Sequence, residues 1–318
     1  MGPTDVNYEV LPYVSLGNVM RQMAHFQSFS GAFWAWTATT TLFLGAGAAS
    51  FGQALSPTGN PATDPQKIVR DASWNELHAT KPGRSFSYRQ HKVDPKGSTV
   101  KQIVETKDGD VARLIEKNGK PLPPDEAQAE LDRLNNLLAH PEVQEHRHKK
   151  EQEDSARGDE MVRMLPDAFL FTLDGMVEGP NGPCYRLKFR PNPAFTPPDR
   201  EGEVYHGMVG ELWIDQAQLR LVKIDAHLIS DVNFGWGVLG RLYKGGSILV
   251  QNADVGLHHW ETVHMKLQLQ GKLLMMKSVD YSTTEDFSDF QVQPQELGYQ
   301  EAIRLLQKLP AAAEVASK

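Results

Sequence analysis

Residues 210–228, GELWIDQAQLRLVKIDAHL, decide the fold of this chain. In the second half of the stretch, apolar residues alternate with polar or charged ones, which places the apolar side chains on one face of a β-strand. The first half ends at Asp215, and the following QAQ is typical of a short turn. Two strands joined by a short turn pair antiparallel, so the stretch predicts a hairpin. The apolar side chains expected to share one face are Val222, Ile224, Ala226 and Leu228.

The same alternation recurs on both sides of this hairpin. Residues 259–270, HWETVHMKLQLQ, place Met265 and Leu267 on one face, and residues 247–255 are their natural antiparallel partner. Short alternating runs nearer the N-terminus are separated by turn signals of the kind found in hairpins. These signals are Asp94–Gly97, Asp108–Gly109 and Asn118–Gly119.

Segments 81–120 and 167–290 are therefore predicted to form one antiparallel sheet in an α+β protein. A sheet with one apolar face needs a cover. Residues 65–79 are the expected first part of that cover, because Asp64 can cap a helix that begins at Pro65. The apolar stripe expected on this helix comprises Ile68, Val69, Ala72, Trp74 and Leu77.

Residues 123–164 interrupt the strands with a highly charged segment. The pattern predicts two long polar helices that are broken or bent at Pro141. Apolar side chains are concentrated near the beginning of the segment, so we interpret it as a solvated helical insertion without a core of its own. A last helix is expected over residues 296–309.

The chain has 318 residues, of which 40% are hydrophobic and 23% charged, and its formal net charge is −7. This composition is typical of a globular protein, and an acidic chain lacks the basic surface of a general nucleic-acid binder. Cys184 is the only cysteine, which excludes an intramolecular disulfide and a two-cysteine zinc or redox motif. We expect no cofactor.

Residues 32–50, AFWAWTATTTLFLGAGAAS, form an uncharged run near the N-terminus. Gly52 and Ala54 follow it at the small-residue positions of a signal-peptidase site. We therefore expect residues 1–54 to be an N-terminal extension with a signal peptide cleaved near Ala54. Residues 55–318 would then be a single exported domain of the periplasm or cell envelope. An uncleaved membrane anchor is the alternative, because the run is about long enough to span a bilayer.

Residues 235–247, GWGVLGRLYKGGS, contain the letters of a dinucleotide-binding turn and nearly those of a P-loop. A dinucleotide turn needs a helix after its third glycine, but Gly240 is soon followed by another glycine pair. A P-loop needs a lysine where Gly246 stands. We interpret the stretch as a connection between strands, with an aromatic tip that either contacts a partner or folds back over the sheet. The tip residues are Phe234, Trp236, Val238, Leu239, Leu242 and Tyr243.

Candidate catalytic and metal-binding residues form no convincing set. His259, Glu261 and His264 resemble the zinc motif H-E-x-x-H with one insertion, but on a strand Glu261 points away from His264. We therefore expect solvated strand histidines and no metal site. The carboxylates around the hairpin offer no pair that stands out for acid–base chemistry, so no catalytic residue is identified. These carboxylates are Asp215, Asp225 and Asp231.

With its strand, aspartate, short turn and second strand, the stretch of residues 210–228 resembles the periplasmic lipoprotein carriers LolA and LolB and the related anti-sigma regulator RseB. An N-terminal helix before a long antiparallel meander fits the same superfamily. Several stretches are also similar to an uncharacterised, acidobacterial-type family of exported bacterial proteins. These stretches are MLPDAFLF (164–171), FRPNP (189–193), DVNFGWGVLGRLYKGG (231–246) and HWET (259–262).

The resemblance implies a strongly curved, unclosed half-barrel that is lidded by helices and binds acyl chains in its hollow without a cofactor. It covers about residues 60–120 and 165–290, and it leaves the helices of residues 123–164 unmatched. The chain also lacks the lipobox cysteine of the LolB type.

The function predicted from these features is a non-enzymatic, exported binder or carrier of an apolar ligand, either a lipid or a lipoprotein acyl chain. A membrane surface or an envelope protein is a second expected contact, and nucleic acid is not. The alternatives are a sensing module of RseB type that binds through residues 123–164, and a hydrolase that uses the Asp/His set. The expected ligand-binding residues are Phe234, Trp236, Leu239, Leu242, Tyr243, Val222, Ile224, Leu228, Met265 and Leu267.

Overall fold

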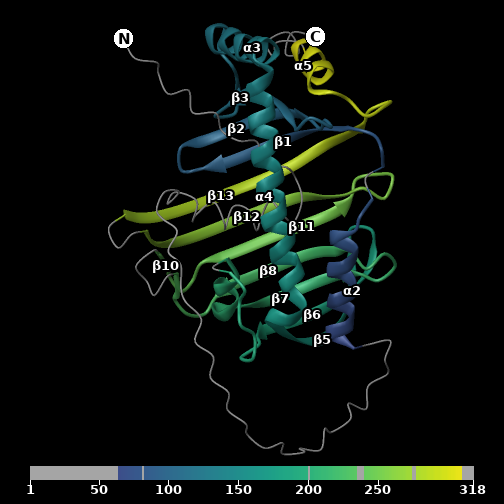
Figure 1. Ribbon diagram of the computed structural model, residues 1–318, viewed down its shortest axis with the longest axis vertical. Helices are drawn as coiled ribbons and strands as arrows, with labels where there is room; N and C mark the ends of the chain where they lie inside the picture. Colours follow the sequence, from purple (N-terminus) through teal and green to yellow (C-terminus); the bar gives the residue numbers. More distant parts are fainter. Residues whose placement is uncertain (1–63, 81, 200, 235–239, 274–276, 310–318) are drawn as a thin grey trace, which may run out of the picture.

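The computed structural model describes residues 64–80, 82–199, 201–234, 240–273 and 277–309. The expected signal peptide, Trp236 and Leu239 lie outside these ranges. Within them, one antiparallel sheet of 13 strands carries helices on its surface (Figure 1). The strands are β1 (Phe86–Asp94), β2 (Gly97–Val104), β3 (Val111–Lys117), β4 (Lys120–Pro121), β5 (Phe169–Gly179), β6 (Gly182–Pro191), β7 (Met208–Asp215), β8 (Leu221–Leu228), β9 (Val232–Phe234), β10 (Gly240–Leu242), β11 (Ser247–Asp254), β12 (Trp260–Leu273) and β13 (Lys277–Val292). The helices are α2 (Pro65–Leu77), α3 (Pro124–Ala139), α4 (Pro141–Ala168), α5 (Tyr299–Gln307) and the short 3₁₀ helix η3 (Glu201–Gly207).

The strand order is β4-β3-β2-β1-β13-β12-β11-β8-β7-β6-β5, with β9 and β10 as a short hairpin beside β12. The strands β4 and β5 lie at opposite ends of this path, so the described sheet is not closed into a barrel. The predicted fold class, an α+β protein with an unclosed antiparallel sheet and covering helices, is confirmed. The meander β1–β4 joins the later strands through the pairing of β1 with β13.

The predicted turns form as expected. The turn at Asn118–Gly119 also contacts Gly97, which follows the turn between β1 and β2. Asn118 and Gly119 both have positive φ, +53° and +70°, in the turn between β3 and β4. The Asn118 side chain accepts a hydrogen bond from the backbone N–H of Ser98 at 3.1 Å. Gly97 has a φ of +134°, which side-chain-bearing residues rarely adopt, and a Cβ atom there would lie 2.1 Å from Oδ1 of Asn118, so glycine is strongly favoured at this position.

The hairpin of residues 210–228 is β7 and β8, with Leu212 opposite Ile224. Asp215 accepts a hydrogen bond from the N–H of Gln218 at 2.6 Å, which confirms its interpretation as a turn residue. The register shifts by one residue at the turn end of β8. Such a bulge reverses the side-chain alternation. For this reason Val222 packs with Cys184 and Trp260 instead of with Ile224, so the predicted common face is wrong at this residue.

Helix α2 begins where the sequence predicts. Asp64 accepts a hydrogen bond from the N–H of Gln66 at 3.0 Å, and Pro65 occupies the first turn. The helix packs against α4, β5, β7 and β8. Trp74 was expected in its buried stripe, but its side chain is 62% exposed. It stacks on His78, with 3.6 Å between ring centroids.

Residues 123–164 form the two predicted helices, α3 and α4, but they are not a solvated insertion. Helix α4 has 28 residues and runs across the sheet on the side that carries α2 (Figure 1). Its buried positions recur every three or four residues, as on one stripe of a helix. The first half of this stripe is polar, which is why a hydrophobic pattern missed it. The stripe consists of Gln144, Arg147, Glu151, Asp154, Gly158, Met161, Leu165 and Ala168.

Helices α3 and α5 cover the strands β2 and β3 with a second apolar cluster. Glu130 of α3 accepts a hydrogen bond from the N–H of Leu114 at 2.8 Å, and Arg133 donates to the carbonyl of Ala112 at 2.6 Å. Both backbone groups lie on β3, so α3 supplies partners where the strand has none in β4.

No helix in the described ranges is both long enough and apolar enough to cross a membrane.

An ion pair ties α2 to the sheet, and we expect it to contribute to stability. Glu76 accepts hydrogen bonds from Nε and Nη2 of Arg220 at 2.9 and 2.8 Å and from the N–H of Leu221 at 2.8 Å. Replacing Glu76 with Ala leaves a largely buried guanidinium unpaired, so the free energy of unfolding should fall by about 3 kcal/mol. Urea denaturation measures this change.

Asp71→Ala on the same helix is the control, because Asp71 forms an exposed ion pair with Lys67. Its effect should stay within about 0.5 kcal/mol. Equal effects of the two substitutions would show that α2 is not anchored through Glu76.

Candidate functional site

Most of the predicted ligand-binding residues that the structure describes lie in one apolar cluster. Ile224, Leu228, Met265 and Leu267 are between 0% and 3% exposed. They belong to β8 and β12, which pack with α2, α4, η3 and the neighbouring strands. Burial in this cluster fits the predicted apolar face, and the role of these residues in ligand binding stays a prediction.

The described ends of the glycine-rich connection fold back into the protein. Phe234 and Leu242 are 4% and 3% exposed and belong to the same apolar cluster. They lie on β9 and β10, which pair with each other. For these two residues an exposed tip is wrong, because both side chains are buried in the core. Tyr243 is half-buried, and Trp236 and Leu239 lie outside the described residues.

The described residues that follow Gly240 form strands, and not the helix that a dinucleotide turn requires. Gly240 begins the strand β10, a turn at Gly245 follows, and β11 begins at Ser247. From Gly240 onward, the described part of this stretch therefore offers no helix N-terminus to a pyrophosphate.

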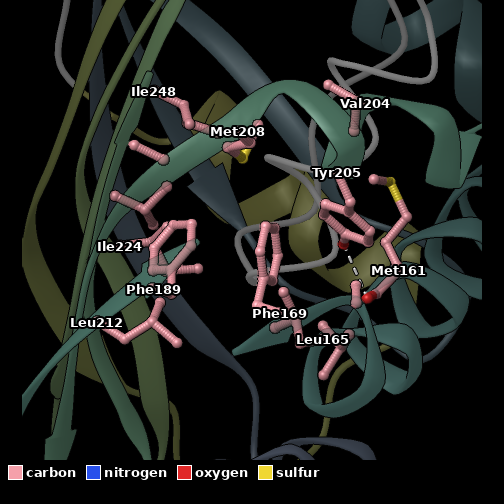
Figure 2. Packing of buried hydrophobic residues seen from close by; sticks show 14 of the residues in the cluster. Met161, Leu165, Phe169, Phe189, Val204, Tyr205, Met208, Leu212, Ile224 and Ile248 are labelled. Atoms are coloured by element: carbon pink, nitrogen blue, oxygen red, sulfur yellow. Dashed lines mark hydrogen bonds between the residues drawn. The ribbon is translucent and has the colours of Figure 1, made fainter. Parts of the chain in front are cut away.

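Figure 2 shows how the helical cover meets the sheet. Phe169, at the junction of α4 and β5, lies between Phe189 of the sheet and Tyr205 of η3, with ring centroids 4.6 and 4.9 Å away. The hydroxyl of Tyr205 donates a hydrogen bond to the carbonyl oxygen of Met161 at 2.9 Å. The C-terminal half of α4 is thus joined to the sheet by aromatic packing and to η3 by a buried hydrogen bond.

A small polar cavity lies beside the C-terminal end of α2. It has a volume of about 180 Å³ and is bordered by the end of α2, the middle of α4 and the start of β12. Asn252 and Thr262 of its wall hydrogen-bond to each other at 2.9 Å, and Asn252 also donates to the carbonyl of Leu221. His259 and Glu261 line the same cavity.

His259 is not the solvated histidine that the sequence predicts. It is 8% exposed, and its Nε2 lies 3.0 Å from Glu261 and 3.6 Å from Glu105. Burial lowers the pKa of His259, but the two carboxylates outweigh this effect and raise it to about 9. His264 lies apart from this group and pairs with Asp286 at 2.7 Å.

Sequence reasoning missed Glu105 as a partner of His259. Glu105 directly follows β2, where nothing in the local pattern distinguishes it from a turn residue. Its approach to His259 results from the order of the strands, which a motif search along the chain does not see.

The remaining candidates for chemistry have separate structural partners. Asp215 caps its turn, Asp225 pairs with Lys223 at 3.0 Å, and Asp231 accepts a hydrogen bond from the N–H of Lys244 at 2.9 Å. Burial, assisted by nearby carboxylates, raises the pKa of the Cys184 thiol to about 11. This thiol therefore stays protonated near neutral pH and is not an activated nucleophile.

Comparisons with known proteins find likeness only in three-dimensional structure. No protein-family profile matches the chain, and no curated protein sequence matches it. A LolA superfamily protein from Nitrosomonas europaea is similar, with 11% identity, a TM-score of 0.27 and coverage of 72% of this chain and 94% of that one. A putative outer membrane lipoprotein-sorting protein domain from Vibrio parahaemolyticus has 11% identity, a TM-score of 0.31 and coverage of 78% and 100%. A DUF1329 family protein from Desulfovibrio piger has 12% identity, a TM-score of 0.27 and coverage of 73% and 95%.

These three similarities to solved structures concern general architecture.

The burial of Phe234 leads to a prediction about stability. Phe234→Ala removes a 4% exposed aromatic side chain from the apolar cluster, so the free energy of unfolding should fall by about 3–5 kcal/mol. Chemical denaturation measures the change. Ile229→Ala is the control, because Ile229 is nearby in sequence and 45% exposed, and its effect should be within about 0.5 kcal/mol. A Phe234→Ala protein as stable as the control would contradict the packing described above.

Proposed function

We propose that this protein is a non-enzymatic, exported carrier or binder of an apolar ligand, such as a lipid or a lipoprotein acyl chain. The ligand is taken up against the apolar side chains of the sheet, on the side that carries α4. The observation that carries this proposal is the buried stripe of α4, which is apolar in its C-terminal half and polar in its N-terminal half.

The C-terminal half of the stripe keeps α4 attached. Met161 and Leu165 are buried in the main apolar cluster, and Met161 accepts the hydrogen bond of Tyr205. Gln66 of α2 donates hydrogen bonds to the carbonyls of Pro166 and Phe169, which adds a second connection. Opening this end would expose apolar surface to water and is therefore costly.

The N-terminal half of the stripe is held differently. Arg147 and Glu151 are each 5% exposed and lie one helical turn apart. Burial lowers the pKa of Arg147, while Glu151 counteracts this shift. Taking charges out of water is costly, so a buried polar contact contributes less net stability than an apolar contact of the same size. When this half separates, its charged groups regain water.

Two further features suit a cover that opens at one end. Gly158 lies in the stripe between the two halves. Among the amino acids, only proline lowers the stability of a helix interior more than glycine does. Gln144 holds the far end through the carbonyls of Asp108 and Gly109, at 3.0 and 3.2 Å. Water can replace these two hydrogen bonds on opening.

The apolar cluster itself is rich in methionine, which adapts to ligands of different shape because its side chain is flexible and polarizable. The buried methionines are Met161, Met164, Met208 and Met265. A carrier of this kind acts outside the cytoplasm, as the uncharged run of residues 32–50 and the cleavage signal at Ala54 predict. There it exchanges its ligand with a membrane surface or with an envelope protein.

The proposal predicts that the polar half of the stripe controls ligand exchange. The double variant Arg147→Met with Glu151→Leu replaces two buried side chains of opposite charge, which attract each other, by apolar ones, and such a replacement is often neutral or stabilising. Uptake of cis-parinaric acid, followed by stopped-flow fluorescence, should become roughly tenfold slower because the cover opens less often. Its thermal stability should equal or exceed that of the unmodified protein.

Lys149→Met with Glu153→Leu is the matched control, since both positions lie exposed on the same helix at the same spacing. It should take up the probe at the unmodified rate. Native mass spectrometry of the full chain, purified from expressing bacteria, should in addition detect a bound lipid. Absence of any lipid together with no binding of cis-parinaric acid would overturn the proposal, and equal rates for both double variants would reject the role of α4.

A further inference from the structure

We infer that Glu105, His259 and Glu261 form a binding site for a divalent transition-metal ion, of which zinc is the representative. Glu105 follows β2, whereas His259 and Glu261 lie at the start of β12. One ligand atom from each residue lies within 4.8 Å of the other two. An imidazole combined with carboxylates is a donor set that suits zinc and related first-row ions.

The distances between the donor atoms fit a single ion. Nε2 of His259 lies 3.0 Å from Oε1 of Glu261 and 3.6 Å from Oε1 of Glu105. Nitrogen and oxygen ligands stand about 2.0–2.2 Å from zinc in a tetrahedral site, which puts neighbouring ligand atoms about 3.3–3.6 Å apart. The two separations from Nε2 therefore need only small side-chain adjustments around an ion, and the carboxylate ligand atoms lie within 4.8 Å of each other.

An ordinary ion pair accounts less well for this geometry. In an ion pair the ring N–H points along a line to one carboxylate oxygen. Nε2 of His259 is buried and makes no hydrogen bond of acceptable geometry, although carboxylate oxygens flank it. A buried ring nitrogen between two carboxylates, with one ligand atom of each residue within 4.8 Å of the others, is an arrangement that suits a shared cation.

The surroundings hold the histidine ring and leave room for a further ligand. Phe86 stacks on His259, with 4.4 Å between ring centroids and an interplanar angle of 25°. Glu105 is oriented by the N–H of Phe86, which donates to its Oε2 at 3.3 Å. The polar cavity of about 180 Å³ beside His259 and Glu261 has space for water molecules. A zinc ion with three protein ligands takes such a water as its fourth ligand.

The turn before His259 has an unusual backbone that fixes this position. Leu257 and His258 both have φ of 58°, a conformation that is uncommon for residues other than glycine, asparagine, aspartate and histidine, so Leu257 is the unusual residue of the turn. The N–H of Val255 donates to the carbonyl of His259 at 2.9 Å, and the N–H of His259 donates to the carbonyl of Gly256 at 3.0 Å. Strained backbone of this kind persists where surrounding contacts hold it, and it is common at functional sites.

A metal ion here joins two parts of the sheet. Glu105 belongs to the meander β1–β4, and the other two ligands belong to the start of β12. A ligand that binds the folded protein and not the unfolded chain raises the melting temperature. Zinc binding should therefore raise the free energy of unfolding of the protein.

The test uses the full chain, treated with EDTA and dialysed, with zinc chloride as the probe. Isothermal titration calorimetry should detect about one zinc ion per chain with micromolar or tighter affinity, and zinc should raise the melting temperature. His259→Gln and, separately, Glu105→Gln should each weaken zinc binding at least about tenfold. Cobalt(II) should give a visible d–d absorption spectrum in the unmodified protein and lose it in both variants.

His264→Gln is the matched control, because His264 lies on the same strand and pairs with a single carboxylate. It should bind zinc as the unmodified protein does. Circular dichroism of the metal-free variants checks that they fold. If His259→Gln does not fold, Glu105→Gln still tests the site. Absence of stoichiometric zinc binding, or equal loss of affinity in the His264 variant, would overturn the inference in favour of a purely structural ion pair or adventitious binding.

Discussion

The pairing of β1 with β13 is the constraint on which the rest of the structure depends. The strand β13 has 16 residues and pairs with β12 on one side and β1 on the other. Without this pairing, the described strands would form two separate sheets, each with an unpaired edge. The pairing places α5 over β2 and β3. It also brings Glu105 beside His259, so the proposed metal site exists only because the first strand and the last strand meet.

In helix α4, favourable apolar burial at one end is combined with the costly burial of charged side chains at the other. Its buried stripe follows one regular spacing, yet its two halves bury opposite kinds of side chain. Apolar burial and a hydrogen bond from Tyr205 hold the C-terminal half. The N-terminal half buries Arg147 and Glu151 at a desolvation cost that apolar side chains would avoid. A helix that protects the sheet fully would not need this composition, and a helix that opens at one end benefits from it.

Local patterns predicted the elements well where neighbouring residues decide the structure. The turns at Asp94–Gly97 and Asn118–Gly119, the cap at Asp64 and the hairpin of residues 210–228 all depend on contacts within a few residues. Patterns failed where distant contacts decide. A bulge turned Val222 to the other face, and the polar stripe of α4 was read as a solvated surface because its partners lie far away in the chain.

The sequence by itself determined the α+β class, most of the strands and helices, and the turns between them, because backbone propensities and side-chain alternation are local properties. Only the tertiary structure decided which side chains meet: that Phe234 packs into the core, that α4 lies across the sheet, and that Glu105 and Glu261 flank His259. The physical reason is that the pairing order of strands places residues together regardless of their distance along the chain. The pKa of a buried charged group is therefore set by these distant neighbours and not by the residues next to it in the sequence.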